Sequence, residues 1–279
     1  MNKKKISLFL MYLIMFIVTV YYLTPILVLV STSLKPQGQV LSRTWEWIPR
    51  TFTLDNYKYV LQQYPYLKWT TNSLLVTGGT VLLTLAISLP TGYAFARLKI
   101  RGKNLLFSLV LLTIMIPFFA YTPQLYLLIT KLGLRNTYLG LIVPMSTSGV
   151  SIFLFRQFIQ QLPPDLEEAA VLDGCSNWGI FFRVILPLTK PAITTSVIFT
   201  AVKSWNNLLW PLIASSDNAV KTLPVGLSVN VFQVETGLNN QPPYGIVMAA
   251  ALLSIILPIL LFIFLQRYFI QGIATTGLK

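Results

Sequence analysis

The chain of 279 residues is apolar and basic: 54% of its residues are hydrophobic, only 10% are charged, and the mean hydropathy is +0.67. Soluble domains carry about 25% charged residues, so this composition excludes an ordinary globular enzyme, a disordered chain and a disulfide scaffold, and leaves an integral membrane protein. The net charge of +13 fits that class, because basic residues of membrane proteins collect in cytoplasmic loops. The chain has no His and one Cys, Cys175, so we expect no metal site.

Six stretches are long and apolar enough to cross a bilayer, which takes about 20 mostly apolar residues. They predict an all-α fold, a polytopic membrane protein with six transmembrane helices in a single domain over residues 1–279. The predicted spans are Ile6–Val30, Asn72–Ala96, Leu105–Ile129, Tyr138–Phe158, Ala192–Ala214 and Gly245–Gln266.

Basic residues in the short loops indicate the orientation, since cytoplasmic loops carry an excess of Lys and Arg. Lys3–Lys5 and the cluster at Arg97–Lys103 both belong on the cytoplasmic side. We therefore expect cytoplasmic termini, an extracytoplasmic loop at residues 31–71 and a cytoplasmic loop at residues 159–191. Two tryptophans of the outer loop, Trp45 and Trp47, leave two interpretations open: anchors at the bilayer interface, or a docking surface for a partner.

The cytoplasmic loop predicts a short helix of its own. Pro163 and Pro164 suit the opening of a helix. Three acidic residues crowd positions 165–168, in the first turn, where the helix dipole favours negative charge. Gly174 can supply the left-handed residue that ends it. Small residues on one face let another backbone approach closely, so this helix is either a docking element for a partner protein or a solvated connector.

The residues of this loop occur in a specific order. They are Glu168-Ala169-Ala170, Asp173-Gly174, Leu186-Pro187 and Pro191. This set resembles the EAA signature of the permeases of binding-protein-dependent ABC importers. Flanking segments are similar to the carbohydrate branch of that family, and within it to the G-type permeases of maltose importers. Those segments are Tyr93–Arg97, Leu132–Thr137, Ser204–Asn206 and Gln266–Phe269.

The resemblance implies a permease subunit of the bacterial cytoplasmic (inner) membrane that moves a sugar or oligosaccharide inward. It implies as partners a homologous second permease, two cytoplasmic ATPase subunits that bind ATP and Mg²⁺, and an extracytoplasmic solute-binding protein. Glu168 would be the acidic contact to an ATPase subunit, and the two alanines would form the close-packed face. The implied ATPase-coupling residues are Glu168, Ala169, Ala170, Asp173 and Gly174, with Leu186, Pro187 and Pro191 supporting the loop.

The chain has no ATP-binding motif of its own. No G-x-x-x-x-G-K-[ST] is present, and Gly102-Lys103 lacks both the upstream Gly and the following Ser or Thr. We therefore expect no catalytic residue and no cofactor in this chain, with ATP hydrolysed by partner subunits. A self-sufficient secondary transporter is the first alternative, but the predicted spans hold no Asp or Glu for an ion site. A purely scaffolding membrane protein is the second alternative.

The predicted fifth span is unusually polar. Lys203 lies near its middle, where a charge costs at least about 2.5–3.5 kcal/mol and should face the bundle interior or water. At helical spacing one face combines Lys203, Asn206, Asn207 and Trp210, extended inward by Ser196 and Thr200. Amides bind sugar hydroxyls and aromatic rings stack on sugars, so this face predicts a substrate path.

Two questions about this face stay open. Lys203 could instead snorkel or pair structurally, and the amides could join helices by hydrogen bonds. If Lys203 does line the path, its charge favours a second substrate class, an anionic glycan such as a uronide or a glycerol-phosphate-like solute.

Overall fold

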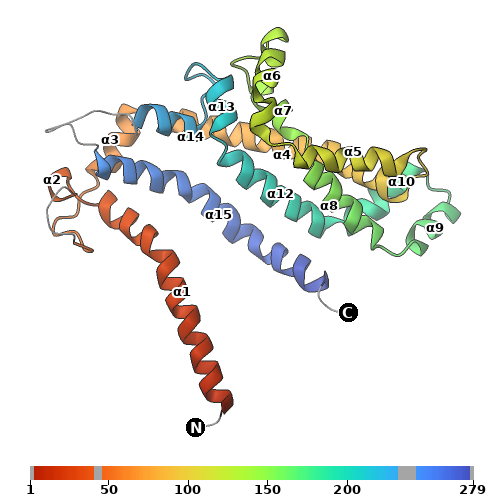
Figure 1. The fold of residues 1–279 in the computed structure, drawn as a ribbon, viewed down its shortest axis with the longest axis horizontal. Coiled ribbons are helices and arrows are strands. Elements are labelled where there is room, and N and C mark those ends of the chain that lie inside the picture. The colour runs from red at the N-terminus through yellow and green to blue at the C-terminus, as the bar shows by residue number, and fades with distance from the viewer. Residues whose placement is uncertain (1–2, 41–45, 232–242, 277–279) are drawn as a thin grey trace. The chain divides into compact units, whose positions relative to one another are not determined.

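The computed structural model describes residues 3–40, 46–231 and 243–276 (Figure 1). Within those ranges the regular structure is helical and no strand occurs, so the predicted all-α class is confirmed. Arg43 and Trp45 of the predicted outer loop lie outside the described residues. The chain forms two compact units, Met1–Leu67 with Gly226–Ile256, and Lys68–Val225 with Leu257–Lys279, and each is described separately below.

The first unit is organised around a long apolar helix. Its elements are α1 (Lys3–Ser33), α2 (Gln37–Val40), α3 (Asp55–Gln63), a π-helical turn η2 (Leu227–Val231) and the first part of α15 (Tyr244–Thr276). Large apolar side chains are exposed all around α1, for example Phe9 and Phe16. A helix that is apolar on every face is stable only when lipid or protein surrounds it, which suits a membrane span.

A buried amide fixes the chain where α1 ends. Asn56 of α3 donates its side-chain N–H groups to the carbonyl oxygens of Ser33, at 2.8 Å, and Lys35, at 2.9 Å. The last carbonyls of a helix have no partner within the helix, so this amide satisfies groups that would otherwise need water. Nearby, a hydrogen bond from the Gln39 amide, together with Arg50, lowers the pKa of Glu46 below its usual value.

The second unit contains the other helices. They are α4 (Tyr66–Arg97), α5 (Lys103–Met115), α6 (Phe118–Lys131), α7 (Tyr138–Ser146), α8 (Gly149–Gln160), α9 (Asp165–Leu172), α10 (Asn177–Ile180), η1 (Phe181–Ile185), α11 (Leu186–Leu188), α12 (Lys190–Trp205), α13 (Leu209–Ala214) and α14 (Leu223–Gly226). α8 packs against both α5 and α12, and α13 packs against α6 and α7.

Three predicted spans are interrupted. The third is two helices, α5 and α6, bent by 99° at Pro117, which has no backbone N–H to continue the hydrogen-bond ladder. The fourth is α7 and α8, bent by 46°, with the Ser148 side chain accepting a hydrogen bond from Ser151 N–H at the new start. The fifth, predicted at Ala192–Ala214, stops at Trp205 and restarts as α13. A continuous helix would have required a donor at Pro211.

Two of the described helices are long and apolar enough to cross a membrane, at Lys5–Ser33 and Tyr66–Arg97. The described residues also contain three bent helix pairs that pass the same length and composition test, which brings the number of spans to as many as five. Within α15, the stretch Tyr244–Leu260 is apolar but shorter than the length this test requires. The third bent pair, Asn177–Leu188 with Lys190–Trp205, begins within the loop expected at residues 159–191 and ends before the end of the predicted fifth span.

Candidate functional site

The helix expected in the loop at residues 159–191 is present as α9, and its end has a specific geometry. Gly174 has φ of +76°, a left-handed conformation that favours glycine. The N–H of Gly174 donates to Val171 O and the N–H of Cys175 donates to Ala170 O, each at 2.9 Å. This pair of bonds is the Schellman motif, which satisfies the terminal carbonyls of the helix. Gly174 therefore ends α9, as expected from its position.

The two alanines of α9 have different surroundings. Ala170 is 8% exposed and packs in a core cluster of the second unit. Ala169 is exposed, as are Glu168 and Asp173. The cluster around Ala170 draws on five other elements: Leu89 and Tyr93 of α4, Phe155 and Ile159 of α8, Ile180 of α10, Phe181 and Ile185 of η1, and Ala192 of α12. One side of α9 is thus fixed to the helices and the other faces outward.

The outward side of α9 carries apolar as well as acidic side chains. Leu172 is 89% exposed and Val171 is 59% exposed. Large apolar side chains are costly to expose to water, so their exposure beside Glu168 marks a surface suited to a protein partner. Sequence reasoning missed these two residues because it looked for small side chains on the contact face.

The segment that follows α9 forms an elbow. The helical run Asn177–Leu188 and helix α12 are bent by 75° at Thr189. Thr189 is fully buried, and its hydroxyl donates to Ile185 O at 2.9 Å. Pro187 and Pro191 stand in the first turns of α11 and α12, where their missing N–H groups break no hydrogen bond. Leu186 is half-buried against the core cluster, so these residues shape the loop.

The polar residues of the predicted fifth span do not form one stripe. Because α12 ends at Trp205, Asn206 and Asn207 lie beyond it and Trp210 belongs to α13. Trp210 is fully buried, and its indole N–H donates to Gly140 O at 3.0 Å. Asn206 is exposed and lines neither of the hollows described next. The predicted continuous face was wrong, because Pro211 prevents the helix that it requires.

Lys203, Asn207 and Thr200 do come together around a cavity. A hollow of about 230 Å³ is lined by these three and by both polar and apolar side chains. A second hollow, of about 660 Å³, shares Lys203 and Asn207 and reaches the bend at Pro117. No carboxylate among the described residues forms an ion pair with Lys203. The additional lining residues of the smaller hollow are Thr80, Met145, Ser148, Val150, Ser151, Phe199 and Ser204.

The sequence did not predict that α7, α8 and the break between them line the hollows around Lys203. Ser148 caps the start of α8 and Ser151 lies in the first turn of that helix, while Asn207 donates to Met145 Sδ at 3.5 Å. The run Ser146-Thr147-Ser148-Gly149 in the middle of an apolar stretch could have indicated a break that lines a cavity, since irregular backbone at membrane depth is tolerated there.

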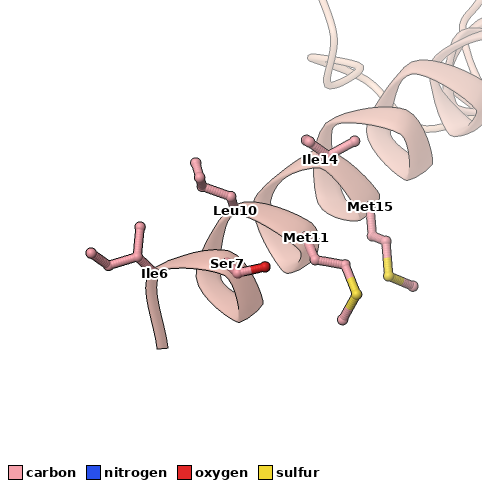
Figure 2. A pocket seen from close by; sticks show the side chains of 6 residues that line it. All are labelled: Ile6, Ser7, Leu10, Met11, Ile14 and Met15. Atoms are coloured by element: carbon pink, nitrogen blue, oxygen red, sulfur yellow. The ribbon is translucent and has the colours of Figure 1, made fainter. Parts of the chain in front are cut away.

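A further hollow lies on α1 alone. Figure 2 shows that its labelled lining side chains all project from this one helix. They are Ile6, Ser7, Leu10, Met11, Ile14 and Met15. Because five of the six are apolar and none is charged, the surface suits lipid or another apolar helix rather than a polar solute.

Comparison with known proteins identifies the family. A model of the family described as binding-protein-dependent transport system inner membrane component matches residues 88–275. The arabinooligosaccharides transport system permease protein AraQ of Halalkalibacterium halodurans is 38% identical over 258 residues, which cover 91% of this chain and 90% of that protein. AraQ of Bacillus subtilis is 37% identical over 261 residues, with 92% and 91% covered.

A solved structure shares the fold. It is a chain of a bacterial ABC transporter involved in the import of the acidic polysaccharide alginate, with a TM-score of 0.86 at 22% identity, covering 96% of this chain and 99% of that one. The relatives are transport permeases and not enzymes. The resemblance inferred from the residues around Glu168 is thereby confirmed, and the chain belongs to the family of binding-protein-dependent transport system inner membrane components.

Proposed function

We propose that this chain is the permease subunit of an ATP-driven importer that moves a sugar or oligosaccharide inward across the bacterial cytoplasmic membrane. It would work with a homologous second permease, two cytoplasmic ATPase subunits and an extracytoplasmic solute-binding protein. ATP and Mg²⁺ would be bound by the ATPase subunits and not by this chain. Six spans with both termini in the cytoplasm complete the proposal.

The observation that carries this proposal is the two-sided helix α9. Its inner side is held by Ala170 in the core cluster, and its outer side presents Glu168 and the exposed Leu172. A helix built in this way can receive a force from a partner and pass it to the helices behind it. In the proposed cycle, the two ATPase subunits bind ATP, close on one another and displace α9. The membrane helices attached to α9 then change the side of the membrane from which the hollows around Lys203 are accessible.

The substrate class follows from the lining and from the relatives. Hydroxyl and amide groups such as those of Thr200, Ser204 and Asn207 pair well with sugar hydroxyls. Two relatives more than a third identical over most of the chain are named arabinooligosaccharide permeases. A neutral oligosaccharide is accordingly the first substrate to test.

Replacement of Glu168 by Lys tests the coupling role. We expect the variant to insert normally, while its complex hydrolyses ATP without importing solute or loses its ATPase subunits. Asp55→Lys is the matched control, since Asp55 is also an exposed acid but lies outside the loop. The measurements are recovery of ATPase subunits with the purified chain, ATP hydrolysis with and without loaded binding protein, and solute uptake in proteoliposomes. Normal stimulation and uptake in Glu168→Lys would refute the role.

A second candidate substrate, an anionic glycan or a glycerol-phosphate-like solute, is favoured by one observation. Lys203 lines both hollows, and no described carboxylate pairs with it. Arabinotriose and trigalacturonate separate the two candidates, because one is neutral and the other anionic. If the anionic candidate is right, Lys203→Ala lowers uptake of trigalacturonate selectively, while Lys131→Ala, which removes an exposed lysine from α6, does not. An unchanged preference in Lys203→Ala would remove this candidate.

A further inference from the structure

Arg97, the last residue of α4, is joined to the cytoplasmic loop at two points. Its Nε lies 2.5 Å from Glu167 Oε1, and its Nη2 donates to Leu162 O, also at 2.5 Å. The side chains of Arg97 and Glu167 are only 18% and 15% exposed. All three residues belong to the second unit. Neither contact was predicted from the sequence, where Arg97 indicated the orientation and belonged to one of the segments that carry the family resemblance.

This ion pair is less exposed than the other two ion pairs among the described residues. Lys58 and Asp55, for comparison, are 68% and 81% exposed, and such surface pairs contribute little. When a largely buried pair is broken by removing one partner, the remaining charge lacks both water and a counter-ion, which is strongly destabilising. Arg97 also uses the planar fork of its guanidinium to make two directional bonds, which a lysine cannot reproduce.

The two contacts tie three helices together. Leu162 follows the end of α8, where its N–H donates to Ile159 O at 3.2 Å. Glu167 lies in the first turn of α9, next to the outward-facing Glu168. The Arg97 side chain at the end of α4 therefore reaches the end of α8 and the start of α9. Figure 1 labels these three helices.

The pair also lies directly beside the proposed docking face. Arg97 and Glu167 line one hollow, of about 420 Å³, together with Glu168 and Leu172. Behind them the contact between α9 and the helices is made by Ala170, a small apolar side chain. Apolar packing is not directional, so Ala170 alone allows α9 to turn or slide. The ion pair between Arg97 and Glu167 fixes the register of α9, and the bond from Arg97 to Leu162 O ties the same side chain to the end of α8.

We propose that Arg97 is a positioning residue that makes α9 move as one body with the cytoplasmic ends of α4 and α8, through Glu167 and the carbonyl of Leu162. This inference rests on the proposed coupling function of α9. Without the Arg97 contacts, α9 rotates about Ala170 when the ATPase subunits close. ATP is then hydrolysed, but the hollows around Lys203 stay accessible from the same side of the membrane.

The test uses a reporter that needs no transported solute. Cys175 is the only cysteine, so the double substitution Cys175→Ser with Val150→Cys places a single thiol in the lining of both hollows. In the complete complex, the rate at which a membrane-impermeant maleimide labels this thiol is measured without nucleotide and with ATP and vanadate, alongside ATP hydrolysis. This single-thiol parent protein should show an ATP-dependent change in the labelling rate.

We expect Arg97→Ala and Glu167→Ala, each added to the single-thiol parent, to reduce that ATP-dependent change about fivefold or more, while complex recovery and ATP hydrolysis persist. The charge swap, Arg97→Glu with Glu167→Arg, should restore part of the change, and Arg97→Lys should be intermediate because it keeps the charge but not the fork. Arg101→Ala, which removes an exposed arginine just beyond α4, should behave as the single-thiol parent does.

An undiminished ATP-dependent change in Arg97→Ala would overturn the inference. A parallel loss of complex recovery and labelling change, not restored by the swap, would also overturn it, since it would show a folding role alone. Glu168→Lys in the same single-thiol parent distinguishes the positioning role of Arg97 from the coupling role of α9. If Glu168→Lys abolishes the ATP-dependent change and Arg97→Ala does not, coupling through α9 is supported and the role of Arg97 is refuted. If neither variant alters the change, both roles are refuted.

Discussion

The side-chain amide of Asn136 donates to the carboxylate of Asp217 at 2.8 Å, and this pair joins the start of α7 to the segment after α13. Asn136 has φ of 58°, a left-handed conformation that asparagine tolerates better than most residues. Its backbone N–H donates to Ala214 O at 2.9 Å, and its side-chain oxygen accepts from Ser216 N–H at 3.1 Å. One residue thereby fastens two segments that are about eighty positions apart.

The Asp217 contact predicts a pH effect on stability. A backbone hydrogen bond from Ala219, then the amide of Asn136, lowers the pKa of Asp217 below its usual value. Since the folded pKa is the lower one, this stabilisation is complete above the ordinary carboxyl pKa of about 3.9 and is lost as the pH falls through the lowered value. Thermal unfolding of the detergent-solubilised chain measures this effect as a fall of the melting temperature at low pH. We expect that fall to be smaller in Asp217→Asn, which has no carboxylate to protonate at this position. Identical pH profiles for both proteins would contradict the prediction.

Gly92 marks a close approach of α4 to α8. A Cβ added at Gly92 would stand 2.5 Å from Phe155 Cβ and 3.1 Å from Arg156 N, so the helices would have to separate. We expect Gly92→Ala to destabilise the chain by about 1–3 kcal/mol, measured by thermal unfolding. Gly78→Ala is the matched control on the same helix, because a Cβ there meets nothing within 4 Å. Equal stability of the two variants would argue against this close approach.

Gly174 ends α9 through its backbone conformation and not through packing. A Cβ at this position has open space, so any cost of Gly174→Ala comes from φ of +76°. We expect a loss of about 1–2 kcal/mol, with weaker recovery of the ATPase subunits because α9 no longer ends in a fixed place. Gly174→Asn should recover much of the loss, since asparagine enters this conformation more readily than alanine does. A Gly174→Asn variant as impaired as Gly174→Ala would point to another cause.

Trp210 is predicted to support the fold and not to bind the substrate. Its ring is fully buried with an edge-to-face contact to Phe118, and its N–H satisfies Gly140 O. Trp210→Phe removes the donor and should cost about 1–3 kcal/mol in thermal unfolding, because Gly140 O is left without that partner. The relative uptake of arabinotriose and trigalacturonate should not change. Phe119→Ala, at a side chain 74% exposed, is the control and should be close to neutral.

The local parts of the site could be predicted from the sequence because they depend on neighbouring residues. The start of α9 after Pro163 and Pro164, and its end at Gly174, follow from capping preferences that act within one turn. The substrate face could not be predicted in the same way. That prediction required an unbroken helix through Asn206. Pro211, four residues beyond Asn207, already indicated a break in this helix.

The sequence by itself determined the membrane class, the all-α fold and the family, because composition and the ordered residues around Glu168 carry that information locally. Only the tertiary structure showed that Ala170 faces the core, that Trp210 is buried, and that Arg97 binds Glu167 across about seventy positions. These facts depend on where helices bend and which ends meet, and a bend of 75° or 99° redirects every residue after it. Helical periodicity predicts a face only as far as the helix stays continuous.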